Sequence, residues 1–257
     1  MPTSMRGACF AFSFVLVAAL LLGGAGCDDN GGTGGTAFPT DPDAPTPSGE
    51  TENVGVPIQE GDDIVTLRGH FYGPQHPVAV ILAHMRPNDQ RAWAPFAQEL
   101  ADAGYAAFTF DFRGYGETGG DEDFDKLDDD LAAVLQFLRN RGKEQIFLVG
   151  ASMGGTASLV VAAAHPVEGV VAVSSPAEFE GHDAVDAVSR ITAPKLFIAS
   201  QDDTEAIGLE ELLDAASEPV ESELYTGNAH GTNLLQGEHA AAFKARILRF
   251  LEEQGSS

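Results

Sequence analysis

The stretch around Ser152 constrains the fold of this chain more than any other. An apolar run at 146–149 is followed by Gly-Ala-Ser-Met-Gly at 150–154 and then by a run of small, helix-compatible residues. This pattern is typical of a strand-to-helix turn so tight that side chains at Gly150 and Gly154 would collide with backbone. We therefore expect Ser152 in a strained conformation, with its hydroxyl exposed at a helix N-terminus. The alternative is a glycine-rich turn with an idle serine, since the chain holds 29 glycines.

Seven apolar runs predict β-strands, and helical patterns separate most of them. The runs cover residues 64–72, 78–83, 105–110, 145–149, 169–174, 195–199 and 220–225. The first alternates between apolar and polar residues, whereas most of the others are continuously apolar. Continuous runs indicate strands buried on both faces, which a parallel sheet requires. The pattern predicts a doubly wound α/β domain with six parallel strands and one or two antiparallel strands at its start.

The predicted helices carry start, stop and packing signals of their own. Pro95 suits the first position of a helix, and Gly104 suits the position just after its end. Apolar side chains recur at helical spacing within residues 124–138 and 243–251. Such stripes predict helix faces packed into the core rather than cofactor sites.

The charge balance and the cysteines exclude several classes of partner and site. The chain carries 14 basic and 39 acidic residues, a formal net charge of −25. No basic stripe is available to displace the counterions of phosphates, so we expect no nucleic acid as a partner. Electrostatic docking on anionic lipid is disfavoured as well. Because the two cysteines, Cys9 and Cys27, lie near the N-terminus, we expect no disulfide, thiolate nucleophile or zinc–thiolate site in the folded domain.

Residues 1–27 have the organisation of an export signal. Arg6 supplies a positive charge, and 8–22 form an apolar run that is too short and too poorly flanked for a transmembrane helix. Small residues then lead into Cys27, and this resembles the lipobox of bacterial lipoproteins, whose cysteine becomes the acylated first residue. The match departs at Gly24, where leucine is usual, so cleavage without lipidation stays an alternative.

Residues 28–57 are rich in Gly, Thr, Pro and Asp and hold almost no apolar side chains. Such a segment cannot bury enough surface to offset its ordering entropy, so we expect a flexible tether, with the folded domain at 58–257. The resemblance at Cys27 implies a lipid anchor in the bacterial cell envelope, from which the tether holds the domain off the membrane. The alternative is a soluble secreted or periplasmic protein.

The candidate functional residues lie where the predicted strands end. Ligands of an open parallel sheet bind beyond the carboxyl ends of its strands. The segments that follow four of the runs are 84–86, 111–116, 200–203 and 226–232. With the turn at Ser152, they bring Asp203 and His230 to the same edge of the sheet, in the chain order serine, aspartate, histidine.

From about residue 64 to residue 251 the chain resembles the serine α/β-hydrolases, and is similar to small lidless members such as dienelactone hydrolases and carboxylesterases. The matching motifs are Leu-Ala-His at 82–84, Asp-x-Arg-Gly-Tyr-Gly at 111–116, Gly-Ala-Ser-Met-Gly-Gly at 150–155 and Asn-Ala-His-Gly at 228–231. The resemblance implies an α/β-hydrolase fold without a large cap domain, and the order of the three residues is that of the family's triad. Dienelactone hydrolases use cysteine where this chain has Ser152, so their particular reaction does not carry over.

The chemistry of acyl transfer assigns a role to each of the three residues. A serine hydroxyl is a poor nucleophile at neutral pH, so a base must remove its proton as it attacks. We assign Ser152 as the nucleophile and His230, in a short glycine-flanked loop after the last strand, as the base. An acid must orient the histidine and stabilise its charged form. Asp203 has the family spacing for that acid, and its neighbour Asp202 is the alternative.

Two backbone N–H groups are expected to form an oxyanion hole, each worth about 3 kcal/mol in the transition state. Met153, directly after the nucleophile, supplies one of them. The family's His-Gly-x loop corresponds to residues 84–86 and implies Arg86 as the second donor, with Met85 in reserve. Met85 stands where the family usually has glycine, and His84 is expected to shape the loop without reacting.

Two further motifs are interpreted as structural. Residues 121–125 carry carboxylates at the spacing of a calcium loop, but Lys126 replaces the required glycine and Ala132 the required glutamate. These acids are expected to complement the N-terminus of the following helix. Arg113 is expected to shape the loop 111–116. We expect neither a metal ion nor a cofactor.

The sequence as a whole predicts a serine hydrolase that forms an acyl-serine intermediate on an ester or thioester and releases it with water. Residues 175–192 leave too little chain for a large cap, which favours an open site and an exposed acylated substrate. Two alternatives stay open: an amidase or peptidase with the same triad, and a hydrolase-like binding lipoprotein without turnover. Fold similarity cannot choose among esters, thioesters, lactones and peptides.

Overall fold

One eight-stranded sheet organises residues 51–255, the part of the chain that the computed structural model describes. The strand order is β1-β2-β4-β3-β5-β6-β9-β10, with β1 and β2 antiparallel and all pairs from β4 to β10 parallel. The strands are β1 (Thr51–Glu60), β2 (Asp63–Tyr72), β3 (Val78–Ala83), β4 (Ala106–Phe110), β5 (Gln145–Ala151), β6 (Gly169–Val173), β9 (Lys195–Ser200) and β10 (Val220–Tyr225). The predicted α/β fold, with six parallel strands and an antiparallel start, is confirmed.

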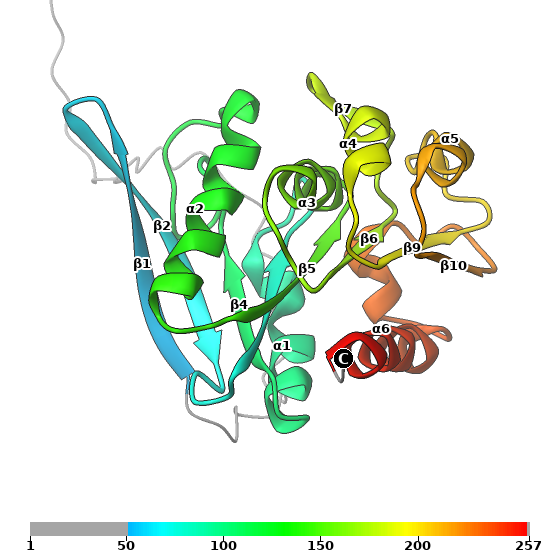
Figure 1. Cartoon of the computed structure of the whole chain (residues 1–257), viewed down its shortest axis with the longest axis horizontal. Helices are drawn as coiled ribbons and strands as arrows, with labels where there is room; N and C mark the ends of the chain where they lie inside the picture. Colours follow the sequence, from blue (N-terminus) through cyan, green and yellow to red (C-terminus); the bar gives the residue numbers. More distant parts are fainter. Residues whose placement is uncertain (1–50, 256–257) are drawn as a thin grey trace, which may run out of the picture. The chain divides into compact units, whose positions relative to one another are not determined.

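Helices cover both faces of this sheet (Figure 1). Packed on one face are α2, α3, α4 and α5, while α1 and α6 pack on the other. The helices are α1 (Ala94–Asp102), α2 (Leu127–Asn140), α3 (Met153–Ala164), α4 (Ala184–Arg190), α5 (Leu209–Ala215) and α6 (Ala240–Gly255), with short 3₁₀ turns η1 (Gln90–Trp93), η2 (Phe124–Lys126) and η3 (Gly231–Leu235).

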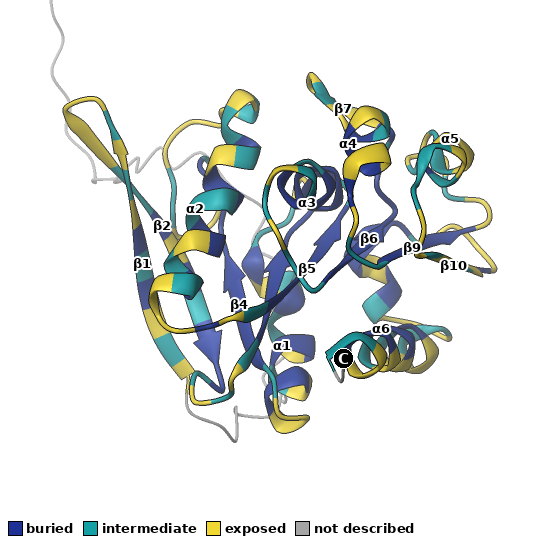
Figure 2. Cartoon of the chain, in the orientation of Figure 1, coloured by how far each residue is buried: buried dark blue, intermediate teal, exposed yellow. Residues whose placement is uncertain are grey.

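Strand β5 shows why the central strands are apolar without interruption. Successive side chains of a strand point to opposite faces of the sheet. Ile146 and Leu148 accordingly pack under α2 and α3, whereas Phe147 and Val149 pack against α6 and α1. Both faces are buried, so neither set of positions tolerates a polar residue, and the strand cores in Figure 2 are dark blue throughout the middle of the sheet.

The helices follow the signals in their sequences. Pro95 lies in the first turn of α1, and Gly104 follows that helix with φ +95°, a conformation that favours glycine. The two apolar stripes are core faces, as predicted: Leu131 and Leu138 of α2 and Phe250 of α6 are fully buried. The outer faces of α2 and α6 are exposed in Figure 2.

The predicted start of the domain at residue 58 is wrong by seven residues. Strand β1 begins at Thr51 and pairs with β2 along its whole length, from Thr51 opposite Tyr72 to Glu60 opposite Asp63. Val54 and Val56 point inward and are buried. Before residue 58 only these two alternate positions carry apolar side chains apart from Pro57, which is too short a pattern to indicate a strand, and β2 supplies the pairing that makes it one. Residues 28–50 of the predicted tether, and the predicted signal with Cys27, lie outside the described residues.

The chain between β6 and β9 forms a small hairpin and one short helix. The hairpin pairs β7 (Glu178–Phe179) with β8 (His182–Asp183), and α4 follows it directly. This agrees with the expectation that no large cap domain covers the sheet. Within residues 51–255, no helix is long and apolar enough to cross a membrane.

Candidate active site

Ser152 occupies the turn between β5 and α3 in the strained conformation that its sequence predicts. Its φ is +47° and its ψ is −117°, a backbone region that residues with a Cβ rarely adopt. The Ser152 amide donates to the carbonyl of Val173 (2.8 Å), and its own carbonyl accepts from the amides of Gly155 and Thr156 (2.9 and 3.0 Å). The side chain is partly exposed at the N-terminus of α3. These hydrogen bonds hold the residue in a conformation that it would otherwise avoid.

The glycines around Ser152 are required by close backbone approach. A Cβ at Gly150 would lie 2.1 Å from the carbonyl oxygen of Gly154. One at Gly154 would lie 2.5 Å from the carbonyl oxygen of Ala83, at the end of β3. The first turn of α3 therefore rests directly on the segment that follows β3, and any larger residue would push the two apart.

His230 and Asp203 form a nearly buried pair beside this turn. Nδ1 of His230 lies 2.9 Å from Oδ2 and 3.0 Å from Oδ1 of Asp203, and the two side chains are 10% and 2% exposed. Because the carboxylate only accepts, Nδ1 carries the proton and the neutral ring keeps its lone pair on Nε2. Asp202, the alternative acid, is instead exposed, and its amide donates to the carbonyl of Gly227.

The pair shifts both pKa values in the direction of an ion pair. Burial opposes charge on His230, but the hydrogen bond and charge of Asp203, with the charge of Glu205, outweigh it and raise the pKa of His230. Burial would likewise raise the pKa of Asp203. The hydrogen bond and charge of His230, the Ser174 hydroxyl and the hydrogen bond from the Glu205 amide outweigh it and lower that pKa. Asp203 is therefore a carboxylate at neutral pH, suited to stabilising a charged imidazole.

The loop that carries His230 packs directly on the turn that carries Ser152. A Cβ at Gly231 would lie 3.3 Å from Cβ of Ala151 and 2.5 Å from Sδ of Met85. The residue after the histidine thus touches the residue before the serine. Ser152, Asp203 and His230 are therefore gathered where β5, β9 and β10 end, as the order of the strands requires.

The loop after β3 is held by His84. This side chain is fully buried, its Nδ1 lies 3.1 Å from the Met85 carbonyl oxygen, and its Nε2 accepts from the Phe112 amide (3.1 Å). Burial lowers the pKa of His84, so the ring is neutral, and it packs edge-on against Phe112 and Tyr115. The geometry agrees with a shaping role for His84, since both ring nitrogens are occupied within the loops.

The two predicted oxyanion donors belong to segments that meet at this site. Met153 is the first residue of α3, where the amide has no partner within the helix. Arg86 follows the segment that the first turn of α3 touches at Ala83. Its guanidinium lies 5.3 Å from the Phe124 ring centre and 3.8 Å from a Glu122 carboxylate oxygen. Their role as donors stays a prediction.

Comparison with known proteins places the chain in a family. Residues 74–202, half of the chain, match the sequence profile of the serine aminopeptidase S33 family of hydrolases. The chain belongs to this family. The matched segment contains Ser152 and ends one residue before Asp203.

Individual relatives of this S33 chain include lipases. It is 32% identical over 109 residues to the thermostable monoacylglycerol lipase of Bacillus sp. strain H-257. The aligned region covers 41% of this chain and 43% of that enzyme. The chain thus spans less than half the length of this relative. The Pyrococcus furiosus esterase Pf2001 has the same fold (TM-score 0.68, 21% identity, 84% of this chain and 96% of that one). So does dienelactone hydrolase from Anabaena variabilis (TM-score 0.65, 20% identity, 79% and 98%).

In this S33 chain, Asp111 and Arg113 stabilise the loop 111–116. The buried carboxylate of Asp111 accepts from the amide and side chain of Gln90 and from the Glu117 amide, each at 2.8 Å. Arg113 binds the fully buried Asp130 through Nε (3.1 Å) and Nη2 (2.5 Å). A third contact of Arg113 reaches Glu60 (2.8 Å). Both side chains are thus fully engaged within the protein, in agreement with the structural interpretation of this motif.

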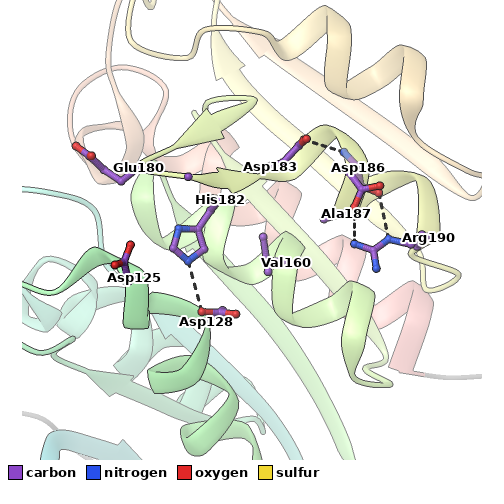
Figure 3. A pocket seen from close by; sticks show the side chains of 10 residues that line it. Asp125, Asp128, Val160, Glu180, His182, Asp183, Asp186, Ala187 and Arg190 are labelled. Carbon is purple, nitrogen blue, oxygen red and sulfur yellow. Dashed lines mark hydrogen bonds and ion pairs between the residues drawn. The ribbon is translucent and has the colours of Figure 1, made fainter.

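A pocket of about 390 Å³ opens elsewhere on the S33 domain, between the start of α2, the middle of α3 and the β7–β8 hairpin (Figure 3). Val160 of its lining lies seven residues beyond Met153, about 10 Å along the helix, so this pocket is separate from Ser152. The side chain of His182 in this lining is 10% exposed and lies 3.4 Å from Asp128. In the described chain, no group of three or more His, Cys, Asp or Glu residues is arranged to hold a metal ion.

One residue of the site carries no signal in the sequence. Ser174 follows β6, has a left-handed backbone (φ +49°), and carries a buried hydroxyl that helps to lower the pKa of Asp203. Serine at a strand end is common in proteins and no motif marks it. The contact with Asp203 depends on two strands that are far apart in sequence, so only the folded chain reveals it.

Proposed function

We propose that this protein is a serine hydrolase that cleaves carboxylic esters, thioesters included, through an acyl-serine intermediate. The observation that carries the proposal is the Asp203–His230 pair, 2.9 Å apart, beside a serine held at φ +47° in a chain of the S33 family. The names of the relatives support the choice of ester, since a monoacylglycerol lipase is among them.

The proposed reaction uses the chain's own residues in two steps. The Ser152 hydroxyl attacks the carbonyl carbon while Nε2 of His230 takes its proton, and Asp203 stabilises the imidazolium that forms. The amides of Met153 and Arg86 bind the oxyanion, each contributing about 3 kcal/mol. The C–O or C–S bond then breaks, and His230 gives its proton to the leaving alcohol or thiol. Water, deprotonated by His230, then attacks the acyl-serine; the bond to Ser152 Oγ breaks, His230 returns the proton to Oγ, and the acid is released.

Labelling with a fluorophosphonate tests the nucleophile. We expect one adduct, on Ser152, in the wild-type protein and in Asp202→Asn, and none in Ser152→Ala or His230→Ala. Far-UV circular dichroism of each variant checks that it is folded. A folded wild-type protein without an adduct at Ser152 would overturn the proposal and favour the alternative of a binding protein without turnover.

The second candidate is an aminopeptidase, and the description of the S33 family favours it. It uses the same triad, so labelling cannot separate the two. Hydrolysis of an acyl p-nitrophenyl ester and of the matching p-nitroanilide can, because they share the acyl group and differ only in the leaving group. We expect kcat/KM to be higher for the ester than for the anilide. The ratio of the two values should be far larger than the ratio of their uncatalysed hydrolysis rates in buffer. An aminoacyl anilide hydrolysed as fast as the ester would reverse the assignment.

We also propose that the enzyme is attached to the bacterial cell envelope through lipid on Cys27. The support is the sequence of residues 1–27, with its short apolar run and the small residues before Cys27. Intact-mass measurement of protein extracted from membranes should give a diacylated and N-acylated Cys27 as the first residue. Cys27→Ala should be found in the soluble fraction, and an unmodified Cys27 in the wild-type protein would leave a soluble exported enzyme.

A further inference from the structure

Ser174 has a backbone conformation that calls for an explanation. Of the non-glycine residues in the described part of the chain, only Ser152, Ser174 and Glu180 have a positive φ. Glu180 lies in the turn of the β7–β8 hairpin, where such a φ is usual. Ser174 (φ +49°) instead directly follows the buried strand β6. Non-glycine residues held in this region cluster at functional sites, because the surrounding structure must over-determine them.

The backbone around Ser174 joins the nucleophile turn to the strand that carries the acid. The Ser174 amide donates to the carbonyl of Ile198 in β9 (2.7 Å), two residues before that strand ends. The carbonyl of Val173, immediately before Ser174, accepts from the amide of Ser152 (2.8 Å). Ser174 therefore lies between the two strand ends that supply Ser152 and Asp203.

The Ser174 side chain is buried with its hydroxyl close to the acid. The residue is 1% exposed, and Oγ makes no hydrogen bond of normal geometry. A buried hydroxyl without a partner is unfavourable, so its orientation requires a reason. The group with which it interacts is the carboxylate of Asp203, whose pKa it helps to lower. That carboxylate has lone pairs to spare beyond those used by Nδ1 of His230 and the Glu205 amide.

We propose that Ser174 is a positioning residue of the triad: its hydroxyl donates to the Asp203 carboxylate and holds it against Nδ1 of His230. The left-handed backbone is what directs this side chain from the end of β6 toward the end of β9. The inference rests on the proposed function for its effect on turnover, but the contact itself is a property of the resting protein. Glu205 also acts on this pair, through its charge on His230 and through its amide, which donates to Asp203.

Two substitutions separate the hydroxyl from the backbone. Ser174→Ala removes the hydroxyl and keeps the unfavourable φ. Ser174→Gly also removes the hydroxyl, but glycine adopts this φ without strain. The glycine variant should therefore fold even if the alanine variant does not. Ser175→Ala is the matched control, because Ser175 is an adjacent buried serine whose hydroxyl is also unpartnered but faces Gly155.

The first readout is the ¹H NMR resonance of the proton between Nδ1 of His230 and Asp203, measured without substrate. A proton held by a carboxylate resonates at low field, and His230→Ala assigns the signal. We expect this resonance to move upfield or to be lost by exchange in both Ser174 variants, and to stay in place in Ser175→Ala. A resonance at the wild-type position in Ser174→Gly would overturn the proposal, because it would show that the hydroxyl is not needed to hold Asp203 against His230.

The second readout is ester hydrolysis. Both Ser174 variants should lose about tenfold in kcat, a change of about 1.4 kcal/mol, with KM little altered. An equal loss in Ser175→Ala would overturn the proposal, since it would indicate general disturbance of the core. Absence of activity and of fluorophosphonate labelling in the wild-type protein would contradict the proposed function instead, and the resonance would still test the contact.

Discussion

At the scale of single residues, the candidate site depends on two serines whose backbones are held against their preference. Ser152 and Ser174 both have a φ near +48°, and each follows a central strand. The sequence identifies the first because glycines at 150 and 154 mark the tight turn. It does not identify the second, since nothing in the local sequence requires a left-handed residue there.

The pH dependence of turnover follows from His230. Only the neutral ring can accept the proton of Ser152, and the raised pKa of His230 keeps the ring charged to a higher pH than usual. We therefore expect kcat/KM for an ester to rise with pH through a midpoint above 6.5, the ordinary value for histidine. A profile that is flat from pH 5 to pH 8 would contradict the assignment of the base.

Asp203→Asn supplies the control for this prediction. Without the carboxylate, burial dominates, so the midpoint should fall below its wild-type position. The rate should drop by roughly 10³- to 10⁴-fold, as expected for loss of the group that orients the base. Asp202→Asn should leave both quantities unchanged, because Asp202 is exposed and makes only a backbone contact.

At the scale of elements, most strands and helices could be predicted because each carries its own pattern. Strands such as β5 are apolar throughout, and helices such as α2 and α6 have one apolar stripe. Strand β1 does not carry such a pattern. Its apolar side chains are Val54, Val56 and the partly buried Ile58 at alternate positions, together with a proline, and Pro57 is tolerated because the strand lies at the edge of the sheet.

Val56→Ala tests whether β1 belongs to the folded domain. Val56 is 1% exposed, so removing two methyl groups should lower the free energy of unfolding by about 2 kcal/mol. Urea unfolding at an unchanged slope measures the loss. Ile64→Ala is the control: this side chain is 63% exposed, and its loss should cost less than about 0.5 kcal/mol. Equal unfolding midpoints for Val56→Ala and wild type would instead indicate that this segment belongs to the tether and not to the folded domain.

At the scale of the whole molecule, the sheet order brings together residues that are far apart in the chain. Ser152, Asp203 and His230 follow β5, β9 and β10, and the order β5-β6-β9-β10 places these strand ends along one edge. The sequence predicted this gathering in outline, because parallel strands bring their carboxyl ends to the same side. It could not choose between Asp202 and Asp203 from the local residues.

What the sequence determined by itself were the features that depend on near neighbours. These are the buried strands, the helix faces, the glycine-bounded turn at Ser152 and the choice of Ser152 and His230 as candidate nucleophile and base. Tertiary structure decided the pairing of β1, the choice of Asp203 for His230, and the placing of Ser174 beside the acid. The physical reason is that each of these contacts forms between separate elements, so its energy arises only when the elements are assembled. Strand β1 is close to β2 in the chain but gains its ladder and its buried valines only by pairing, whereas Asp203, His230 and Ser174 follow different strands.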